Sequence, residues 1–384
     1  MKQPLPVVSL FSGTGGLDLA VETMTSSVES PVRDGMAQVR VSVEWGDEEC
    51  DTLRANFDGL VLEGDITQMS AKEILDTGGL GPGDPMLVVG GPPCTPFSKS
   101  GFWLDYKRES RDPKASLLDD YVRVVDHARP EAFLLENVQG LTYKTHSDQF
   151  ARLIQSLKGL GYSIQWKLMN AAEHGVPQLR KRVFVVGRRD GQLFHFPEPT
   201  HSGWSEHSRQ VDPSKVPFVA SGEVLKDLLP GSPEEGEIAD GTFGELLARV
   251  PPGENYLYFS ERGPEETHFG WRSRYWTFLL RLDPMRPSST LQAQPGPWVG
   301  PFHWENVQNS EGLPRARRLR TPELLRLMTF PDDYKVAGNR AAVHRQLGNA
   351  VPVQFGRVVL RSLLEQLGYL EPEERHPTGQ LAVF

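Results

Sequence analysis

Short apolar runs alternate with amphipathic segments through the first half of the chain, and this alternation restricts the fold more than any other feature. The runs are residues 7–11, 39–43, 86–89, 132–135 and 183–186. Runs rich in β-branched residues are typical of buried strands in a parallel sheet. Segments 117–129 and 150–160 carry apolar residues at helical spacing. The alternation therefore predicts an α/β fold with a doubly wound, mostly parallel sheet.

The regular pattern stops near residue 187, where the chain becomes rich in Pro, Gly, Ser and His. An acidic, turn-rich stretch follows at 230–237, and helical spacing returns only at 322–329 and 353–367. This change predicts a smaller, irregular domain inserted into the main one. The expected segments are a first part of the main domain (1–190), the inserted domain (191–285), a return to the main domain (286–370) and a flexible tail (371–384).

Composition excludes several functional classes. Two cysteines, Cys50 and Cys94, are too few for a four-thiolate zinc site or a disulfide scaffold, so we expect no metal. The chain has no apolar stretch of about 18 residues and no signal-peptide pattern, which favours a cytoplasmic protein without membrane contact. The 41 Lys and Arg against 50 Asp and Glu give a net charge of −9. A nucleic-acid partner would therefore require local basic segments.

A glycine-rich segment, FSGTGGLD, spans residues 11–18 and closes the first apolar run. Glycines there let the backbone approach a ligand, and the N-terminus of the next helix offers free N–H groups. A dinucleotide-binding fingerprint would need glycine where Asp18 stands. A carboxylate in the first helical turn repels a pyrophosphate and suits a ligand with an amino group or hydroxyls. A plain tight turn is the alternative.

Two further acidic positions follow the next strands. Glu44-Trp45 ends the second, where a carboxylate can accept hydrogen bonds from ribose hydroxyls. Asp65-Ile66 follows the third, where it could bind an adenine amino group and contact the ring. Each pair alone is more often a surface carboxylate beside a core residue. Together they indicate a nucleoside ligand without phosphate.

Cys94 stands in the sequence GGPPCTPFS at 90–98, directly after the run 86–89. It is therefore expected at the carboxyl edge of a strand, where open α/β sheets bind ligands. A lone cysteine is usually a small buried hydrophobic residue. A stiff Gly-Pro turn at this edge instead favours an accessible thiolate nucleophile. Cys50, inside a helical pattern at 47–57, is expected in the core.

Glu136-Asn137-Val138 follows the run 132–135 in the same way, so Glu136 is expected at the same edge as Cys94. Partial burial would raise the pKa of Glu136 and let it share a proton with a ring nitrogen. The alternative is a helix capped by Asn137 with Glu136 exposed.

The sequence QLRKR at 178–182 precedes the run 183–186. Strand alternation puts Arg180 and Arg182 on one face. Such basic pairs are usually solvated, but a guanidinium also suits an exocyclic oxygen or a phosphate.

These motifs, in this order, resemble those of the C5-cytosine DNA methyltransferases over about 1–190 and 285–367. The glycine-rich segment resembles that family's first motif, PPC at 92–94 its nucleophile loop, ENV at 136–138 its acid motif and QLRKR its QxRxR motif. Residues 320–334, which include FPDDY, resemble its ninth motif, and GNAVPV at 348–353 resembles its tenth.

The resemblance implies a class I S-adenosylmethionine-dependent methyltransferase fold, Rossmann-like, with a smaller irregular target-recognition domain at 191–285. The tenth motif would pack back beside the first strand and complete the site for the cofactor, S-adenosylmethionine. The residues implied to line that site are Phe11, Gly13, Gly15, Gly16, Leu17, Asp18, Glu44, Trp45, Asp65, Ile66, Pro93, Leu117, Asn349 and Val351.

The resemblance also implies the chemistry. The Cys94 thiolate would attack C6 of cytosine, Glu136 would hold or protonate N3, and Arg182 would contact O2, with Arg180 in the same catalytic group. Addition makes C5 nucleophilic enough to take the methyl group, and loss of the C5 proton and of the thiolate releases 5-methylcytosine. The base must leave the duplex to reach Cys94. The family often has Gln where Thr95 stands, which puts one contact to the flipped base in doubt.

Double-stranded DNA is the implied partner. The basic loop 99–114 is placed to close over it as a lid, with an ordinary solvated loop as the alternative. In the target-recognition domain, Arg262, Tyr275 and Trp276 are either DNA contacts or core residues. The expected DNA-binding residues are Ser98, Lys99, Arg108, Arg272, Arg274 and Arg320.

Four arginines between 315 and 320 are expected to contribute to a basic cleft, while the acidic stretches at 230–240 and 371–374 lie away from it. Such a polarised molecule would bind DNA less tightly as salt increases. Two alternatives remain: a tRNA methyltransferase with the same chemistry, and a catalytically silent DNA-binding regulator on the same fold. A separate restriction or defence protein is an expected partner, and the protein itself is expected to be a monomer.

Overall fold

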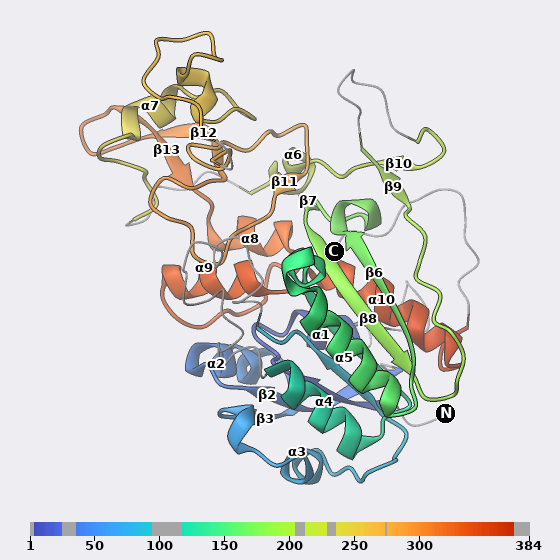
Figure 1. Ribbon diagram of the computed structural model, residues 1–384. Coiled ribbons are helices and arrows are strands. Elements are labelled where there is room, and N and C mark those ends of the chain that lie inside the picture. Colours follow the sequence, from blue (N-terminus) through green and yellow to red (C-terminus); the bar gives the residue numbers. More distant parts are fainter. Residues whose placement is uncertain are drawn as a thin grey trace.

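The structure, a computed structural model, describes residues 4–24, 36–93, 117–203, 212–228, 236–272 and 275–371. Its centre is a seven-stranded sheet in the order β3-β2-β1-β4-β5-β8-β6 (Figure 1). The strands are β1 (Leu5–Leu10), β2 (Ala37–Glu44), β3 (Leu60–Glu63), β4 (Leu87–Gly90), β5 (Ala132–Val138), β6 (Ser163–Asn170) and β8 (Lys181–Arg188).

The strand directions confirm a mostly parallel, doubly wound α/β sheet. Strands β1 to β5 pair in parallel, and β8 lies antiparallel between β5 and β6. Strand β6 was not predicted, because it is an edge strand of mixed composition whose Trp166 is half-exposed. Its pairing with β8, and not an apolar run of its own, makes it a strand.

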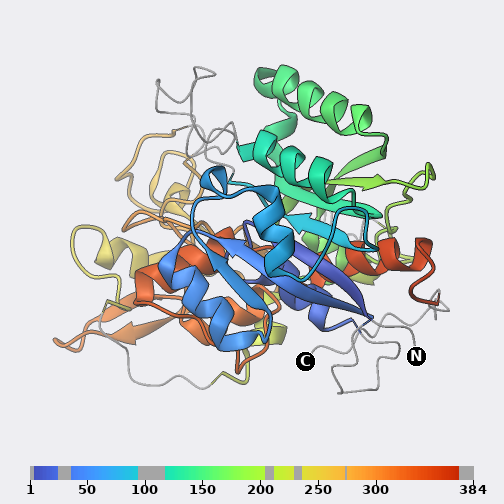
Figure 2. The ribbon, with the colours of Figure 1, turned by 90° about the horizontal axis from the view of Figure 1, so that it is seen from below.

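Helices cover both faces of the sheet. On one face, α1 (Gly16–Glu22) and α10 (Val353–Gln366) pack on the alternate residues of β1 that include Val7. On the other face lie α3 (Ala71–Thr77), α4 (Leu117–Ala128) and α5 (Ser147–Gly159) (Figure 2). They pack on the other set of alternate β1 residues, which includes Val8. The helices expected at 117–129, 150–160 and 353–367 are thereby confirmed. α2 (Asp47–Asn56) lies beside β2 and β3.

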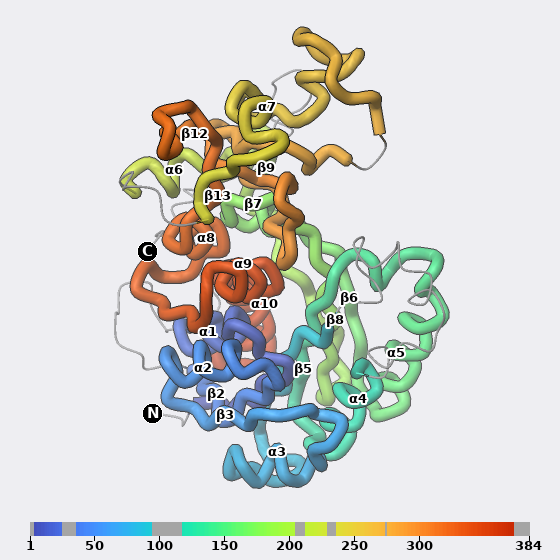
Figure 3. Tube along the Cα trace, turned by 90° about the vertical axis from the view of Figure 1, so that its left-hand side faces the viewer, coloured from blue at the N-terminus to red at the C-terminus, as the bar shows by residue number. Residues whose placement is uncertain are grey.

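A second, smaller lobe has its own hydrophobic cluster and lies above the sheet domain (Figure 3). Phe259, Phe278, Leu279 and Phe302 are among its buried members. The lobe contains α7 (Gly244–Arg249), a 3-10 turn (Tyr256–Phe259) and the antiparallel hairpin of β12 (Phe302–Gln308) and β13 (Pro314–Arg318). This cluster therefore extends past residue 285, where the sequence placed the return to the main domain.

Short elements join the two parts. Helices α8 (Thr321–Leu327) and α9 (Arg340–Asn349) follow the hairpin, and Leu324 and Leu347 belong to the core of the sheet domain. The two-residue strands pair as β7 (Gln178–Leu179) with β11 (Ser288–Ser289), and β9 (His201–Ser202) with β10 (Val216–Pro217). Helix α6 (Ser221–Leu225) contacts α8. Further 3-10 turns are Ile66–Gln68, Gln139–Thr142, Lys144–His146 and Ala171–His174.

Within the described ranges, no helix combines the length and the apolar character needed to cross a bilayer. The same ranges hold no cluster of three or more His, Cys, Asp or Glu side chains placed to bind a metal ion.

Candidate active site

The glycine-rich loop runs from the end of β1 into α1 at the carboxyl edge of the sheet. Phe11, Gly13 and Gly15 all have left-handed backbone conformations, with φ of 55°, 55° and 79°. A Cβ on Gly13 would meet no atom within 4 Å, so this side of the loop is open. The loop therefore presents backbone to open space, as a small-ligand site requires.

Segments from the far end of the chain close the other side of the loop. A Cβ on Gly16 would lie 2.2 Å from the carbonyl oxygen of Val351, so only glycine fits there. The Tyr334 hydroxyl donates to the carbonyl of Thr14 at 2.5 Å. The first contact places the tenth motif against the start of α1, directly after β1, and the second is made by the ninth motif.

Glu44 and Trp45 stand beside the open side of the loop. The Glu44 carboxylate accepts hydrogen bonds from the backbone N–H groups of Gly13 at 2.7 Å, Trp45 at 2.9 Å and Gly46 at 3.1 Å. Burial raises the pKa of Glu44 above its ordinary value, although these three donors oppose the shift. The Trp45 side chain is 66% exposed, which is unusual for tryptophan and leaves its ring face available for stacking.

The remaining positions expected at the cofactor differ in exposure. Asp65 caps the turn Ile66–Gln68 by accepting from Thr67 N–H at 2.9 Å, and Ile66 is buried in the same cluster as Leu118. Leu17 is buried at 6% exposure, whereas Pro93 and Leu117, the first residue of α4, are partly buried. Asn349, the last residue of α9, is exposed.

This donor set fits a nucleoside-bearing cofactor. The Thr14 hydroxyl oxygen in the loop is buried and has no hydrogen-bond partner in the protein, which is the state expected of a group that serves a ligand. An acceptor carboxylate at Glu44, an exposed indole at Trp45 and the open backbone at Gly13 lie on two neighbouring loops, which the hydrogen bond from Gly13 N–H to Glu44 joins at 2.7 Å. No phosphate-binding basic residue interrupts the loop.

Asp18 lies in surroundings that differ from those of the other loop residues. Its side chain is fully buried, and the carboxylate accepts from the Ser9 hydroxyl at 2.9 Å and the Ser42 hydroxyl at 2.6 Å. Burial raises the pKa of Asp18 to about 6, against the lowering effect of the two serines. Asp18 is thus part of the support beneath the loop, a role that a sequence motif does not reveal because Ser42 lies on another strand.

Glu136 and Arg182 form the acidic and basic centre of the site. Strand β5 continues through Val138, which excludes the alternative in which Asn137 caps a helix. Arg182 Nε lies 2.9 Å from Glu136 Oε1, and both side chains are about nine-tenths buried. Burial raises the pKa of Glu136, although Arg182 and Arg180 oppose the shift.

The nucleophile loop starts next to this pair. A Cβ on Gly91 would lie 3.2 Å from Glu136 Oε2, and the Asn137 side-chain amide donates to the Pro92 carbonyl at 3.2 Å. The end of β4 and the end of β5 therefore meet at one edge, as expected. Cys94 itself, with Thr95 and the loop 99–114, lies outside the described residues. Cys50 is fully buried in α2, as expected for a core cysteine.

Arg180 has a different environment from Arg182. It lies between β7 and β8 and is fully buried. Its guanidinium donates to the carbonyls of Gly348 at 2.9 Å, Ala350 at 2.7 Å and Leu291 at 3.3 Å. Arg180 thus ties the QxRxR segment to the tenth motif, and the sequence could not indicate this because these three carbonyls are more than 100 residues away.

The expected DNA-contacting residues fall into three groups. Ser98, Lys99, Arg108 and Arg274 lie outside the described residues. Arg272 is exposed, and its guanidinium lies over the Tyr275 ring at 5.8 Å. Tyr275 and Trp276 are 40% and 51% exposed, so they are not core residues, whereas Phe278 is. Arg262 likewise lies over the half-exposed Trp271 ring at 4.6 Å.

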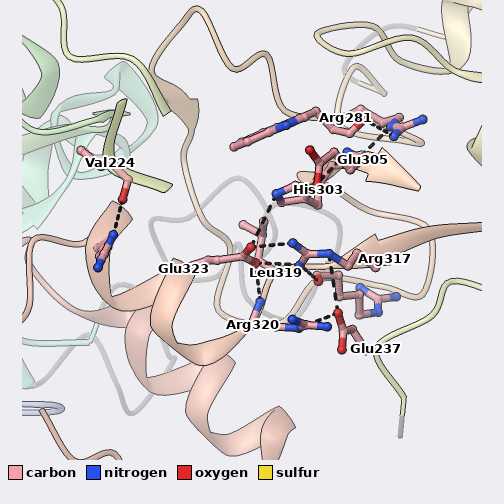
Figure 4. Close-up of polar contacts among 12 residues, drawn as sticks. Val224, Glu237, Arg281, His303, Glu305, Arg317, Leu319, Arg320 and Glu323 are labelled. Atoms are coloured by element: carbon pink, nitrogen blue, oxygen red, sulfur yellow. Dashed lines mark hydrogen bonds and ion pairs between the residues drawn. The ribbon is translucent and has the colours of Figure 1, made fainter. Parts of the chain in front are cut away.

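Arg320 forms the third group, and its surroundings correct one expectation (Figure 4). Its Nε lies 2.8 Å from Glu237, Arg317 bonds Glu323 through two nitrogens at 2.8 and 2.6 Å, and Arg315 pairs with Asp240 at 2.8 Å. The acidic residues of 230–240 were expected to lie away from these arginines. Glu237 and Asp240 instead neutralise them, because buried guanidinium groups require a charged or carbonyl partner.

Comparison with known protein families gives a single clear result. The family model described as C-5 cytosine-specific DNA methylase matches residues 5–365. The Type II methyltransferase M.SacI of Streptomyces achromogenes is 59% identical over 376 residues, which is 97% of this chain and 95% of that protein. The Type II methyltransferase M.NgoFVII of Neisseria gonorrhoeae is 30% identical over 93% of this chain and 86% of its own length.

Solved structures agree at the level of the fold. A putative DNA modification methyltransferase from an E. coli prophage superposes with a TM-score of 0.66 at 21% identity, covering 95% of this chain and 99% of that one. The methyltransferase EhMeth of Entamoeba histolytica superposes with a TM-score of 0.64 at 16% identity, covering 95% and 99%. Both support the class I methyltransferase fold implied by the sheet order.

Proposed function

The chain belongs to the C-5 cytosine-specific DNA methylase family, and we propose on that premise that it modifies a specific duplex sequence through a covalent Cys94 adduct with a flipped-out cytosine. It is a DNA (cytosine-5-)-methyltransferase of the restriction–modification type. The observation that best supports the adduct is the meeting of Glu136, Arg182 and the start of the Cys94 loop at one edge of the sheet.

Glu136 and Arg182 can bind the edge of a cytosine ring that carries N3 and O2. Burial raises the pKa of Glu136, so its carboxyl can carry the proton that N3 takes up as the Cys94 thiolate adds to C6. Arg182, held 2.9 Å away, keeps the carboxyl oriented and can donate to O2. The adduct moves electron density to C5. After methylation, loss of the C5 proton, expulsion of the thiolate and return of the N3 proton to the Glu136 carboxylate restore the aromatic ring.

The second ligand of the reaction is S-adenosylmethionine, held by residues of the glycine-rich loop and its neighbours. Glu44 can accept from ribose hydroxyls, Trp45 can stack on adenine, and the Thr14 hydroxyl can bond a polar group. When bound, this cofactor supplies an electrophilic methyl group to C5. The segment at Val351, which lies against Gly16, would form one wall of this site.

The test of the covalent mechanism uses purified protein, tritiated S-adenosylmethionine and duplex DNA. Methyl transfer to DNA should be resistant to ribonuclease, and DNA containing 5-fluorocytosine should form a covalent complex stable to denaturant. Cys94→Ala should abolish both results while cofactor binding persists. Full activity of the Cys94→Ala protein would contradict the mechanism, and label on RNA alone would contradict a DNA substrate.

We further propose that the chain recognises the same DNA sequence as M.SacI and acts with a separate restriction endonuclease. The 59% identity extends over 97% of the chain and so includes the smaller lobe, which we propose as the target-recognition domain. This domain extends beyond the 191–285 expected from the sequence, because the hairpin of β12 and β13 belongs to the same lobe. Bisulfite sequencing of DNA from cells that express the chain should show methylcytosine at the M.SacI target. Modification at an unrelated sequence would disprove shared specificity without affecting the proposed chemistry.

A further inference from the structure

One buried carboxylate, Asp18, has no role in the reaction described above, although it lies directly beneath the cofactor loop. It is fully buried, and its two hydrogen-bond donors, Ser9 on β1 and Ser42 on β2, are 1% and 3% exposed. A carboxylate placed where water cannot reach it is unfavourable unless the protein uses its charge.

The hydrogen bonds around Asp18 all run in one direction. Ser12 donates its hydroxyl to Ser9 Oγ at 2.8 Å, and Ser9 donates to Asp18 Oδ2 at 2.9 Å. Ser42 donates to Asp18 Oδ1 at 2.6 Å. An ionised carboxylate is an acceptor only, so it fixes the orientation of each hydroxyl proton in this chain.

This chain of bonds ends at the cofactor loop. Ser12 is the second residue of the loop, and its backbone accepts from Gly15 N–H at 2.9 Å and donates to Val43 carbonyl at 3.2 Å. The next residue, Gly13, donates to Glu44 Oε2 at 2.7 Å. The position of Ser12 therefore sets both the open backbone at Gly13 and the carboxylate proposed to bind ribose.

We propose that Asp18 is a positioning residue for the cofactor: its carboxylate orients Ser9, Ser12 and Ser42 and so holds the Gly13 loop and Glu44 in the conformation that binds S-adenosylmethionine. Asp18 acts through these residues and does not touch the ligand. This inference rests on the proposed cofactor. Asparagine has the same shape but offers one acceptor and one donor group, so it would reverse one of the two serine bonds.

The test is titration calorimetry of the full-length protein with S-adenosylmethionine, combined with thermal unfolding. For Asp18→Asn we expect Kd to rise roughly ten-fold, the effect of losing one hydrogen bond to a charged group. The melting temperature at about pH 8 should stay equal or rise, because a buried charge is removed. Ser12→Ala, which leaves Asp18 and its two serines in place, should weaken binding to a similar extent.

Glu22→Gln is the matched control. Glu22 lies one turn further along α1, and its carboxylate accepts from Val39 N–H on β2 at 2.9 Å. Its charge contributes to the raised pKa of Asp18, so this variant removes a neighbouring charge while Asp18 and its serine donors stay in place. This variant should bind S-adenosylmethionine like the wild-type protein.

The possible results separate the two proposals. Wild-type affinity in both Asp18→Asn and Ser12→Ala would overturn the positioning role. A second pattern would also overturn it: Asp18→Asn binds more weakly and melts at a lower temperature, while Ser12→Ala binds normally. That pattern would indicate that Asp18 has a structural role only. If Asp18→Asn does not fold, Ser12→Ala alone decides. A wild-type protein that binds no S-adenosylmethionine would contradict the proposed cofactor itself.

Discussion

At the scale of single residues, the site depends on acidic groups kept in surroundings with little water. Glu136 and Arg182 compensate each other near the end of β5, and both stay polar groups that the proposed mechanism can use to bind a base. Such a pair is more useful for recognition than for stability, since removal of water from both charges offsets much of their attraction.

Glu136→Gln should therefore reduce methylation far more than it reduces stability. The amide cannot supply a proton to N3, and a general acid contributes about 100-fold or more to a rate. Single-turnover methylation with tritiated cofactor measures the loss. Glu73→Gln, an exposed position on α3, is the control and should keep full activity. A Glu136→Gln enzyme with unchanged turnover would contradict the assignment of the acid.

Asp18 gives a stability prediction whose sign follows from its pKa. Burial raises this pKa from 3.8 to about 6, so the folded state holds the proton more tightly than the unfolded chain. The stabilisation is complete below pH 3.8 and is lost as pH rises through about 6, a change of about 3 kcal/mol. Urea titrations give the free energy of unfolding of the wild type and of Asp18→Asn. The wild-type value minus the variant value should fall as pH rises through this range. A flat difference would show that Asp18 is not perturbed.

Sequence motifs identified residues whose partners are close in sequence or whose role follows from position at a strand end. Glu136 and Glu44 are at strand ends, and the structure places them there. The same reasoning could not distinguish Arg180 from Arg182, because strand alternation places both on one face. Of the two, only Arg180 donates to the carbonyls of Gly348 and Ala350, which are distant in the sequence. The family resemblance implied that Asp18 lines the cofactor site. Its bond to Ser42 could not be expected from the sequence, because that bond depends on the pairing of two strands.

At the scale of elements, the approach of α1 to the segment before α10 is the tightest constraint on the site. Gly16→Ala should displace Val351, because the added methyl group would lie 2.2 Å from its carbonyl oxygen. We expect weaker cofactor binding and a loss of stability of about 1–3 kcal/mol, typical of overpacking. Thermal unfolding and calorimetry measure both.

Gly159→Ala is the control for this substitution. Gly159 is the last residue of α5, and a Cβ there would meet no atom within 4 Å. The variant should be at least as stable as the wild type, because alanine favours a helix by up to about 1 kcal/mol over glycine. Equal effects of the two substitutions would argue against a close contact at Gly16.

Helices with a strong apolar face were the elements that the sequence predicted best. The helices α4, α5 and α10 begin and end within three residues of the expected bounds. The hairpin of β12 and β13 was missed, since its strands are partly polar and are held by pairing with each other and by burial of Phe302 and Ala316 in the smaller lobe. Here tertiary contacts decide the structure, and local propensity does not.

At the scale of the whole molecule, a buried ion network joins the two lobes. Arg317 comes from the hairpin of the smaller lobe, Glu323 from α8 of the sheet domain, and both are nearly inaccessible, with Glu237 at 0% exposure on the other side (Figure 4). The orientation of the smaller lobe over the sheet edge is thereby tied to one bidentate pair.

Arg317→Met should destabilise the protein by about 3–5 kcal/mol, because it leaves two carboxylates buried near one another with reduced compensation. Denaturant unfolding measures the change. Lys72→Met removes one partner of an exposed pair with Asp76 on α3 and should cost at most about 0.5 kcal/mol. Similar losses in the two variants would contradict the view that burial determines the strength of this network.

The contact between Gly16 and Val351 also has a consequence for the order of synthesis. One wall of the cofactor pocket is made near the start of translation and the other near its end. While the chain is still on the ribosome, the sheet can form but the pocket cannot. A product that terminates before residue 351 would therefore be inert, and DNA modification in a cell would begin only with finished molecules.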